Sequence, residues 1–313
     1  MILVMGATGH VGSKIVRHLM ENKHPVRCVA RKFPNKEEYR GADLAIGDAN
    51  NVSFLSDAMR GCTAVFTMIP PDPTAEEVRF YQNKFGEVIA ESIEEAGIKK
   101  VVNLSSIGAD LENATGPILG LHDQEERLNE VTTADIVHLR PAYFMENLFQ
   151  GMSSIVSMNK YFGLLDPDLK LPMIATEDIA TRAAFLLMNP EFDGQNIEYL
   201  LGERDVSHNE AIKVIGKALG RPDLEYIKAN TKEARNAMIG SGLSAAWADE
   251  YLIMAEAMNN GSIAATVKRD ATNTTPTSIE RFAETTFLEE YNKALSKEAS
   301  KASRASQRPE RRP

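Results

Sequence analysis

The chain has 313 residues, 43% of them hydrophobic and 25% charged, and its formal net charge is −9. This is ordinary globular composition with enough apolar surface for a sizeable core, so a largely disordered chain is excluded. The acidic balance argues against nucleic acid as a general partner, because neutralising phosphates requires a concentrated basic surface.

No run of about 18 apolar residues occurs, so the sequence predicts no membrane-spanning helix. The first predicted strand begins at Ile2, which leaves no room for a signal peptide ahead of it, and we expect a cytoplasmic protein. Cys28 and Cys62 both lie within or beside predicted buried segments. Two such cysteines imply neither a disulfide framework nor a metal site, and we expect a free thiol at each.

The N-terminal segment predicts a strand, a tight turn, a helix and a second strand. Ile2–Met5 is apolar throughout, and apolar positions from Val11 to Leu19 recur at helical spacing. The second strand, Val26–Ala30, completes a βαβ unit. The turn between the first strand and the helix contains Gly6, Thr8, Gly9, His10, Val11 and Gly12.

The three glycines of this turn are typical of a dinucleotide-binding site. Gly6 allows the tight turn, Gly9 leaves room for a phosphate, and Gly12 lets the helix pack closely on the strand. Main-chain N–H groups and the positive end of the helix hold a pyrophosphate there. Because the glycines follow a strand and open a helix within a βαβ unit, we expect the chain to bind a dinucleotide.

Apolar runs of strand length continue along the first half of the chain and alternate with helical patterns. They lie at 44–46, 64–69, 101–104 and 136–139. Strands that are apolar on both faces and alternate with helices predict an α/β fold with a doubly wound parallel sheet, the Rossmann arrangement. Ligands of such sheets bind beyond the carboxyl ends of the strands, so the loops that follow the strands should border one cleft.

The end of the second strand decides between the two nicotinamide cofactors. An acid there binds the ribose hydroxyls of NAD, whereas a basic residue accommodates the 2′-phosphate of NADP. The chain has Arg31 and Lys32 at this point, with Lys36 close behind. The pattern favours NADPH. The alternative is that Arg31 is only a solvated charge at a strand end.

Other strand ends provide further candidate contacts. Asp48 and Ala49 follow the third strand, where the adenine amino group would lie, and a simple turn aspartate is the alternative. On the nicotinamide side, Ile69 and Pro70 are expected to form an apolar wall. Ser105 and Ser106 follow the fifth strand. Their hydroxyls suit a contact to a ribose or to a substrate oxygen, and the alternative is that they only stabilise a turn.

The pattern changes after about residue 150, where prolines separate shorter helices and isolated strands. We expect residues 1–150 to form the NADP-binding domain and 151–290 to form a smaller α/β lobe. Residues 172–200 are candidates for a segment that returns to the first domain. One helical stripe belongs either to the core or to a lid over the substrate cleft: Leu243, Trp247, Tyr251, Met254 and Met258.

Residues 291–313 carry seven basic residues against two acidic ones, a balance of +5 that leaves about −14 for the rest of the chain. This segment has almost no apolar residues, so it is predicted to be a disordered basic tail. We expect a solvated tail or a cloning remnant. The alternative is a docking arm for RNA or an anionic membrane.

Four segments together resemble the NmrA-like family of atypical short-chain dehydrogenase/reductases. They are the glycine turn, the Val-Ala-Arg end of the second strand, Asn-Leu-Ser-Ser at 103–106 and Leu-Arg-Pro-Ala-Tyr-Phe-Met-Glu-Asn at 139–147. The resemblance extends to about residue 290 and implies NADPH binding. The family contains quinone and dye reductases as well as catalytically silent redox sensors.

Most short-chain dehydrogenases use a tyrosine with a lysine four residues later, and the lysine lowers the tyrosine pKa so that the phenol can pass a proton. In the helix where the resemblance places this pair, the chain has Ile118 and His122. An isoleucine exchanges no proton, which disfavours alcohol–carbonyl interconversion and sugar-nucleotide epimerisation. His122 is the candidate catalytic proton donor, since its charge changes near neutral pH. A ribose contact and a surface histidine are the alternatives.

The resemblance places the substrate mouth at Tyr143, Phe144 and Asn147, where aromatic rings suit a flat acceptor and packing between the lobes is the alternative. The expected function is an NADPH-dependent reductase that transfers hydride to a quinone-like or other conjugated small molecule. The alternative is a non-catalytic NADP(H)-binding redox sensor. No metal and no membrane partner are expected, and the acceptor and the oligomeric state stay open.

Overall fold

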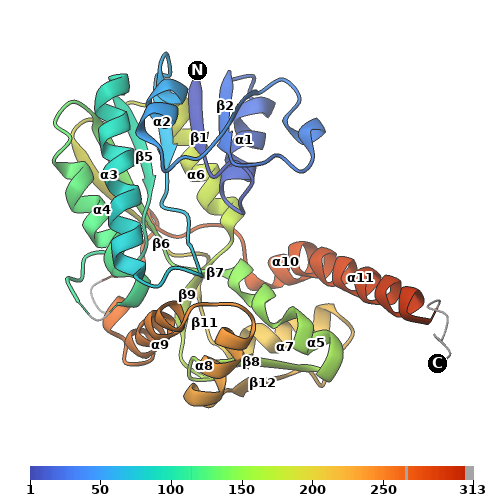
Figure 1. Ribbon diagram of the computed structural model, residues 1–313. Helices are drawn as coiled ribbons and strands as arrows, with labels where there is room; N and C mark the ends of the chain where they lie inside the picture. The colour runs from blue at the N-terminus through green and yellow to red at the C-terminus, as the bar shows by residue number, and fades with distance from the viewer. Residues whose placement is uncertain (114, 265–266, 307–313) are drawn as a thin grey trace, which may run out of the picture.

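A seven-stranded parallel sheet forms the centre of the larger of two lobes (Figure 1). The computed structural model describes residues 1–113, 115–264 and 267–306. The strands lie in the order β10-β6-β5-β4-β1-β2-β3, so the order reverses between β1 and β4. Their bounds are β1 Ile2–Met5, β2 Val26–Ala30, β3 Asp43–Ile46, β4 Ala64–Thr67, β5 Lys100–Leu104, β6 Asp135–Pro141 and β10 Gln195–Leu200. The predicted doubly wound α/β fold is confirmed.

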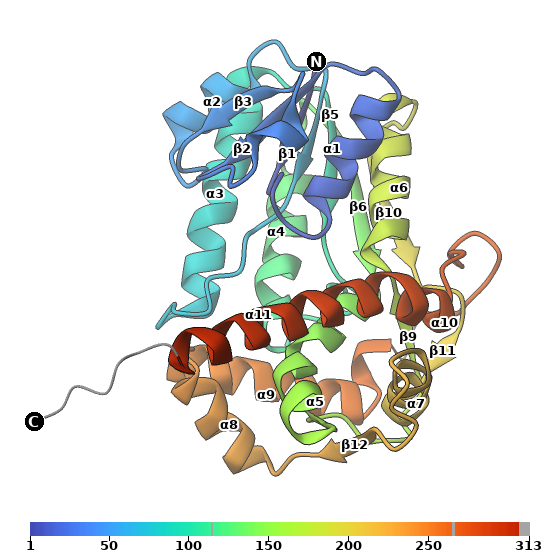
Figure 2. The same cartoon turned by 90° about the vertical axis from the view of Figure 1, so that its right-hand side faces the viewer.

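Helices cover both faces of this sheet, as Figure 2 shows from the side. Alternate residues of β1 divide between the faces: Ile2 and Val4 join one buried cluster and Leu3 and Met5 the other. The first face is covered by α1 (Gly12–Glu21) and α6 (Thr176–Met188), and the second by α2 (Val52–Met59), α3 (Val78–Ala96) and α4 (Leu119–Asn129). Burial on both faces explains the continuous apolar runs in the sequence.

The smaller lobe contains two short sheets and a separate apolar cluster. One sheet has the order β11-β9-β7 and the other pairs β12 with β8. These strands are β7 Tyr143–Phe144, β8 Lys160–Gly163, β9 Leu171–Ile174, β11 Asp205–Val206 and β12 Glu225–Lys228. The helices are α5 Met152–Met158, α7 His208–Ala218, α8 Thr231–Gly240, α9 Ala245–Asn259, α10 Ile279–Phe282 and α11 Leu288–Ser306. Shorter 3₁₀ segments cover 36–39, 116–118, 145–151 and 262–264, and one π turn covers 283–287.

The chain passes between the lobes more than once. After β6 it enters the smaller lobe through β7, and after β9 it returns as α6 and β10. β10 pairs with β6 at the edge of the large sheet. Residues 176–200 therefore complete the larger lobe, whereas β9 itself belongs to the small sheet with β7.

Two expectations about element ends are wrong. β4 ends at Thr67, before Ile69, because Pro70 and Pro71 provide no N–H groups for a longer strand. Residues 291–306, predicted to be disordered, continue helix α11 (Figure 1). Tyr291 is buried, and residues 292–306 contain four alanines and three lysines, which are strong helix formers. Residues 307–313, the rest of the predicted tail, lie outside the described residues.

Candidate functional site

The glycine turn closes through a very close main-chain approach. Gly6 has a positive φ of 61°, and the N–H of Gly9 donates to the Gly6 carbonyl oxygen at 2.9 Å. A Cβ on Gly12 would lie 2.2 Å from the same oxygen, well inside van der Waals contact. Only glycine at position 12 is compatible with this turn, as the sequence predicted.

The outer rim of the turn is open and suits an anion. Thr8, Gly9 and His10 are exposed, whereas Val11 is buried beneath them. The turn leads into the ten-residue helix α1, whose first turn contains no acidic residue. Free N–H groups and the positive end of a helix attract phosphate at such a position. The residues present therefore fit a dinucleotide pyrophosphate.

The basic residues after β2 are available to a phosphate. Arg31, Lys32 and Lys36 are all exposed. Within residues 1–113, 115–264 and 267–306, none of the three forms an ion pair with a carboxylate. Their charges are thus not neutralised by the fold itself.

The side chain of Asp48 stabilises the turn that follows β3. Its carboxylate accepts a hydrogen bond from the N–H of Asn50 at 3.0 Å. The side chain is exposed after β3, and Ala49 beside it is half-buried. Turn chemistry is therefore present at this position, and a contact to adenine stays a prediction.

The polar residues after β5 differ in their accessibility. Ser105 is buried, and its hydroxyl donates to the carboxylate of Glu125, so it is already occupied within the protein. Ser106 is half-buried and donates to the carbonyl of Ile107 at 2.9 Å. Across the cleft, Ile69 is buried, and Pro70 is half-buried with its carbonyl accepting a hydrogen bond from Tyr81.

Beneath Ser105 lies a buried ion pair that the sequence analysis missed. Arg140 on β6 donates to the two carboxylate oxygens of Glu125 on α4, at 3.0 and 2.5 Å. It also donates to the Tyr199 hydroxyl at 2.7 Å. Burial opposes the charge of Arg140, but the hydrogen bonds and attraction of Glu125 raise its pKa above the usual value. An arginine within the apolar run of β6 was the only signal in the sequence.

A second unforeseen cluster joins the glycine turn to the smaller lobe. Lys14 on α1 lies 3.0 Å from Glu146, which is buried just after β7. Glu146 accepts hydrogen bonds from the N–H of Thr176, at 3.1 and 3.0 Å, and from its hydroxyl. The carboxylate therefore stabilises the start of α6 and connects α1, α6 and the segment after β7.

His122 lies on α4 in a defined tautomer. Its Nδ1 is 2.8 Å from the carbonyl oxygen of Ala109. Because a carbonyl only accepts, Nδ1 must carry the hydrogen, and in the neutral ring Nε2 is left as an acceptor. His122 would therefore have to be protonated before Nε2 donated a proton. Its catalytic role remains a prediction.

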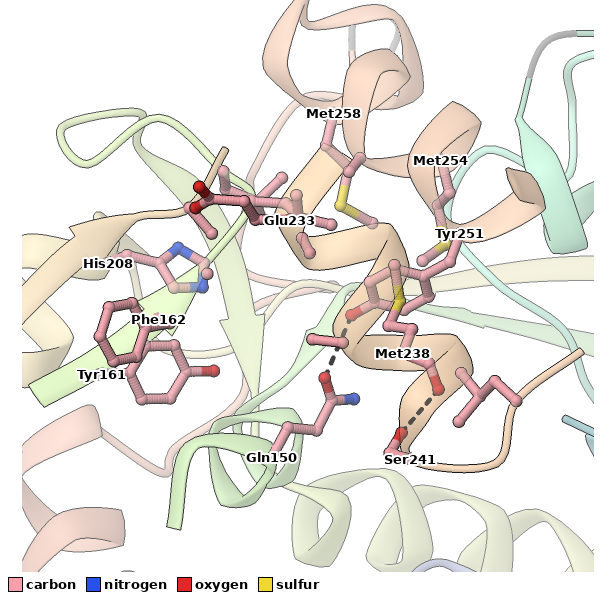
Figure 3. Close-up of a pocket in the computed structure, with 18 of the residues that line it drawn as sticks. Gln150, Tyr161, Phe162, His208, Glu233, Met238, Ser241, Tyr251, Met254 and Met258 are labelled. Carbon is pink, nitrogen blue, oxygen red and sulfur yellow. Dashed lines mark hydrogen bonds between the residues drawn. The ribbon is translucent and has the colours of Figure 1, made fainter. Parts of the chain in front are cut away.

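A cavity of about 740 Å³ lies in the smaller lobe (Figure 3). Its walls come from β8, α8, α9 and the start of α7, and most of its lining is apolar or aromatic. Tyr143 lines it, whereas Phe144 packs against the core of the larger lobe and half-buried Asn147 lies outside it. Of the three predicted substrate residues, the structure thus brings only Tyr143 to the cavity.

The helical stripe of α9 forms much of the cavity wall. The structure places all five of its predicted residues there: Leu243, Trp247, Tyr251, Met254 and Met258. The start of α9 is attached to the larger lobe, because Ser244 donates through its N–H and its hydroxyl to the carbonyls of Pro73 and Ala75, at 2.9 and 2.6 Å. The stripe therefore faces a cavity, while Met254 and Met258 also pack against the core of the larger lobe.

A smaller hollow connects this cavity with the carboxyl end of β5. It has a volume of about 30 Å³ and shares Tyr143 and Met258 with the large cavity. Ile107, which follows β5, forms its other side. The small hollow thus lies between the cavity and the edge of the sheet where the cofactor cleft is expected.

Two buried histidines are kept neutral by their surroundings. Burial lowers the pKa of His208, beside the cavity, to about 4. Burial also lowers the pKa of His138 to about 4, within hydrogen bonds to Asn103 and Asn129 at 3.1 Å each. Both values lie below the ordinary 6.5, so the folded protein binds these protons less readily than the unfolded chain.

Acid should therefore destabilise the protein in a defined range. The histidine contribution is constant above pH 6.5 and is lost as the pH falls towards 4, because the unfolded chain takes up protons first. The loss is on the order of 3 kcal/mol for each histidine. Urea denaturation at several pH values in this range gives the free energy of unfolding. The slope of this free energy against pH should be smaller for His208→Phe than for the wild type. His24→Phe, outside both buried sites, should retain the wild-type slope, and equal slopes in all three proteins would contradict the argument.

Neither cysteine has the surroundings of a reactive thiol. Cys28 is buried, and burial together with the nearby Asp43 raises its pKa to about 12. Burial also raises the pKa of Cys62. Within the part of the chain that the structure describes, no three His, Cys, Asp or Glu side chains gather as metal ligands. No helix in that part is both long and apolar enough to cross a bilayer.

Comparison with known proteins supports the relationship indicated by the sequence motifs. An NAD(P)H azoreductase of Xenophilus azovorans is 28% identical over 251 residues, 80% of this chain and 84% of its own length. A photosystem II assembly factor of Guillardia theta is 26% identical over 184 residues, 57% of this chain and 58% of its own length. The NADPH complex of an NADPH-dependent quinone oxidoreductase from Escherichia coli superposes with a TM-score of 0.72 at 18% identity, covering 92% of this chain and all of the other. The NmrA-like family matches residues 1–291, and the chain belongs to that family.

Proposed function

We propose that the protein is an NADPH-dependent reductase that transfers hydride to a flat, conjugated small molecule such as a quinone. The observation that carries this proposal is the cavity of about 740 Å³, rich in aromatic and methionine side chains, which shares Tyr143 with the small hollow beside the carboxyl end of β5. Aromatic and thioether surfaces favour flat apolar ligands. The azoreductase and the quinone oxidoreductase among its relatives support the same class of reaction.

The residues of the larger lobe would hold the cofactor. The open rim of the glycine turn would bind the pyrophosphate, and Arg31 with its neighbouring lysines would bind the 2′-phosphate. When bound, NADPH supplies the hydride. The loops after β4 and β5, at Ile69 and Ser106, border the end of the cleft nearest the cavity.

The proton required by the reduced acceptor does not come from a tyrosine and lysine pair. No tyrosine in the sequence is followed by lysine four residues later. A quinone or azo acceptor takes hydride directly on an electron-poor system, so its proton is supplied by solvent or by a protonated His122. Oxygen acceptors that need a strong acid at the moment of hydride transfer are disfavoured.

The test is NADPH consumption by the purified protein with menadione and with simple azo dyes as acceptors. Steady oxidation of NADPH that depends on both the protein and the acceptor supports the reductase. Tight NADPH binding without turnover across this panel would overturn it and leave the non-catalytic NADP(H)-binding redox sensor as the alternative.

Cofactor choice depends on Arg31. Arg31→Ala should weaken NADPH binding by about tenfold or more, because a charge-assisted hydrogen bond contributes about 1.5–3 kcal/mol, while NADH binding changes little. Calorimetry with both nucleotides measures the difference. Arg40→Ala, which removes an exposed arginine from the same loop, should change neither affinity. Equal losses for NADPH and NADH in Arg31→Ala would refute the assignment.

A further inference from the structure

We infer that the cavity of the smaller lobe selects neutral acceptors that carry an apolar extension, and that it holds their oxygen end against a polar cluster of Tyr143, Tyr161 and His208. This inference rests on the proposed function and specifies its substrate class. Three observations support it: the size of the cavity, the polar groups at one end and the charges along its wall.

The size indicates a ligand larger than one ring system. At about 740 Å³ the cavity lies within the range that encloses most of a drug-sized molecule. A small quinone would leave much of this apolar wall in contact with water. An apolar extension that displaces this water should tighten binding, by roughly fourfold for each buried methylene group.

The polar groups at one end of the cavity have hydrogen-bonding atoms without partners among the described residues. His208 is 2% exposed, and its Nδ1 is buried without a hydrogen bond from the described residues. Its ring packs against Tyr161, with centroids 6.5 Å apart (Figure 3), and against Tyr143, with centroids 5.4 Å apart. Within the described ranges neither of these two phenols has a hydrogen-bond partner.

Two neighbouring tyrosines provide the contrast. The Tyr251 hydroxyl donates to Gln150 at 3.3 Å, and the Tyr226 hydroxyl donates to the Leu165 carbonyl at 2.7 Å. Burial raises the pKa of Tyr143 and of Tyr161 well above that of a free phenol, so both hydroxyls remain donors. Donors left free in an apolar cavity are suited to a ligand carbonyl.

The charges along the wall discriminate against anions. Among the residues that the structure describes, no lysine or arginine lines the cavity, and the one carboxylate in its lining is Glu233, exposed on α8 at the rim. Burial keeps His208 neutral, so it provides no positive charge at ordinary pH. An anionic acceptor would lose its hydration without gaining a counter-charge and would pass a carboxylate on entry. Neutral acceptors avoid both penalties.

Binding can be followed without turnover, because Trp247 is the single tryptophan of the chain and lines the cavity. Its fluorescence should be quenched by menadione, more tightly by menadione bearing an added hexyl chain, and at least about tenfold more weakly by a naphthoquinone sulfonate, since one unpaired buried charge easily costs that much. Equal affinity for menadione and the sulfonate would overturn the inference.

Glu233→Lys introduces a cation at the rim, so it should reduce the difference in binding affinity between menadione and the sulfonate. Glu256→Lys makes the same charge change on an exposed part of α9 outside the cavity and is the matched control. The expected result is that the affinity for the sulfonate increases in Glu233→Lys and does not increase in Glu256→Lys. The same gain in both variants would show a general charge effect and would overturn the role of the rim.

The polar cluster is tested with matched ligands. Tyr161→Phe removes one hydroxyl and should weaken menadione binding about fivefold, the effect of one net hydrogen bond, without changing the affinity for methylnaphthalene, which lacks oxygen. Calorimetry measures both affinities. Tyr143→Phe should behave in the same way, whereas Tyr291→Phe, on α11 and outside the cavity lining, should retain wild-type affinities. Equal losses of affinity for menadione and methylnaphthalene would contradict the proposed contact between the ligand oxygen and the polar cluster.

These outcomes separate the inference from the proposed function. If neutral quinones quench Trp247 selectively but NADPH is not consumed, the reductase proposal fails and the selectivity of the cavity stands. If NADPH is consumed equally well with menadione and with the sulfonate, the reductase proposal stands and the selectivity fails.

Discussion

Gly12→Ala is expected to weaken NADPH binding by roughly a hundredfold, the upper end of the cost of overpacking a close contact. The added Cβ would lie 2.2 Å from the Gly6 carbonyl oxygen and 2.7 Å from its carbon. Both are main-chain atoms, so no rotamer change relieves the clash, and the turn itself must open. Opening the turn displaces the N–H groups that would face the pyrophosphate.

Gly240→Ala is the matched control, because a Cβ there meets nothing within 4 Å at the end of α8. It should leave the NADPH affinity unchanged. Calorimetry measures the affinity of both variants, and far-UV circular dichroism reports whether Gly12→Ala retains its secondary structure. A folded Gly12→Ala protein that binds NADPH as tightly as the wild type would rule out the glycine turn as the pyrophosphate site.

Glu125→Leu is expected to lower the free energy of unfolding by roughly 3–5 kcal/mol, the usual cost of removing one partner from a buried ion pair. Arg140 is 6% exposed and would keep a guanidinium inside the larger lobe without the carboxylate of Glu125, leaving only the more distant Asp110 at 3.9 Å as a paired anion among the described residues. The change also leaves the buried Ser105 hydroxyl without its acceptor. Both effects lower the free energy of unfolding.

Adding Arg140→Met to Glu125→Leu should recover a large part of this loss, because apolar residues of similar volume often replace a buried pair without penalty. Urea denaturation of the wild type, both single variants and the double variant completes the cycle. Asp249→Ala breaks the exposed pair with Arg235 and should change stability little. Additive losses in the double variant would show that Glu125 and Arg140 do not act as a pair.

The sequence predicts the larger lobe well where a strand is buried on both faces. β1 appears as a continuous apolar run, and β2, β5 and β6 as mostly apolar segments that contain Arg27, Asn103 and His138; the glycine turn fixes the position of the first helix. β10 is not visible in the same way. Its residues alternate between polar and apolar, with Gln195 and Ile197 exposed, because it is an edge strand with little to cover its outer side.

The candidate site was predictable only where it depends on local geometry. The turn around Gly6 requires neighbouring residues, and its pattern can be recognised directly. The polar cluster joins Tyr143, Tyr161 and His208 from three separate elements, so no spacing in the sequence connects them. The stripe through Trp247 and Tyr251 shows that one helix face is apolar, but periodicity does not tell whether that face meets packed side chains or an open cavity.

The late position of β10 in the chain has a consequence for biosynthesis and truncation. A fragment that stops at residue 150 contains β6 but not the strand that pairs with it. The backbone N–H and C=O groups on the edge of β6 that β10 covers in the whole protein would then be available to another molecule, which is the usual origin of edge-to-edge aggregation. The ribosome must therefore deliver residues up to Leu200 before the nucleotide-binding lobe is protected, and attempts to express that lobe alone should retain 176–200 by fusion or circular permutation.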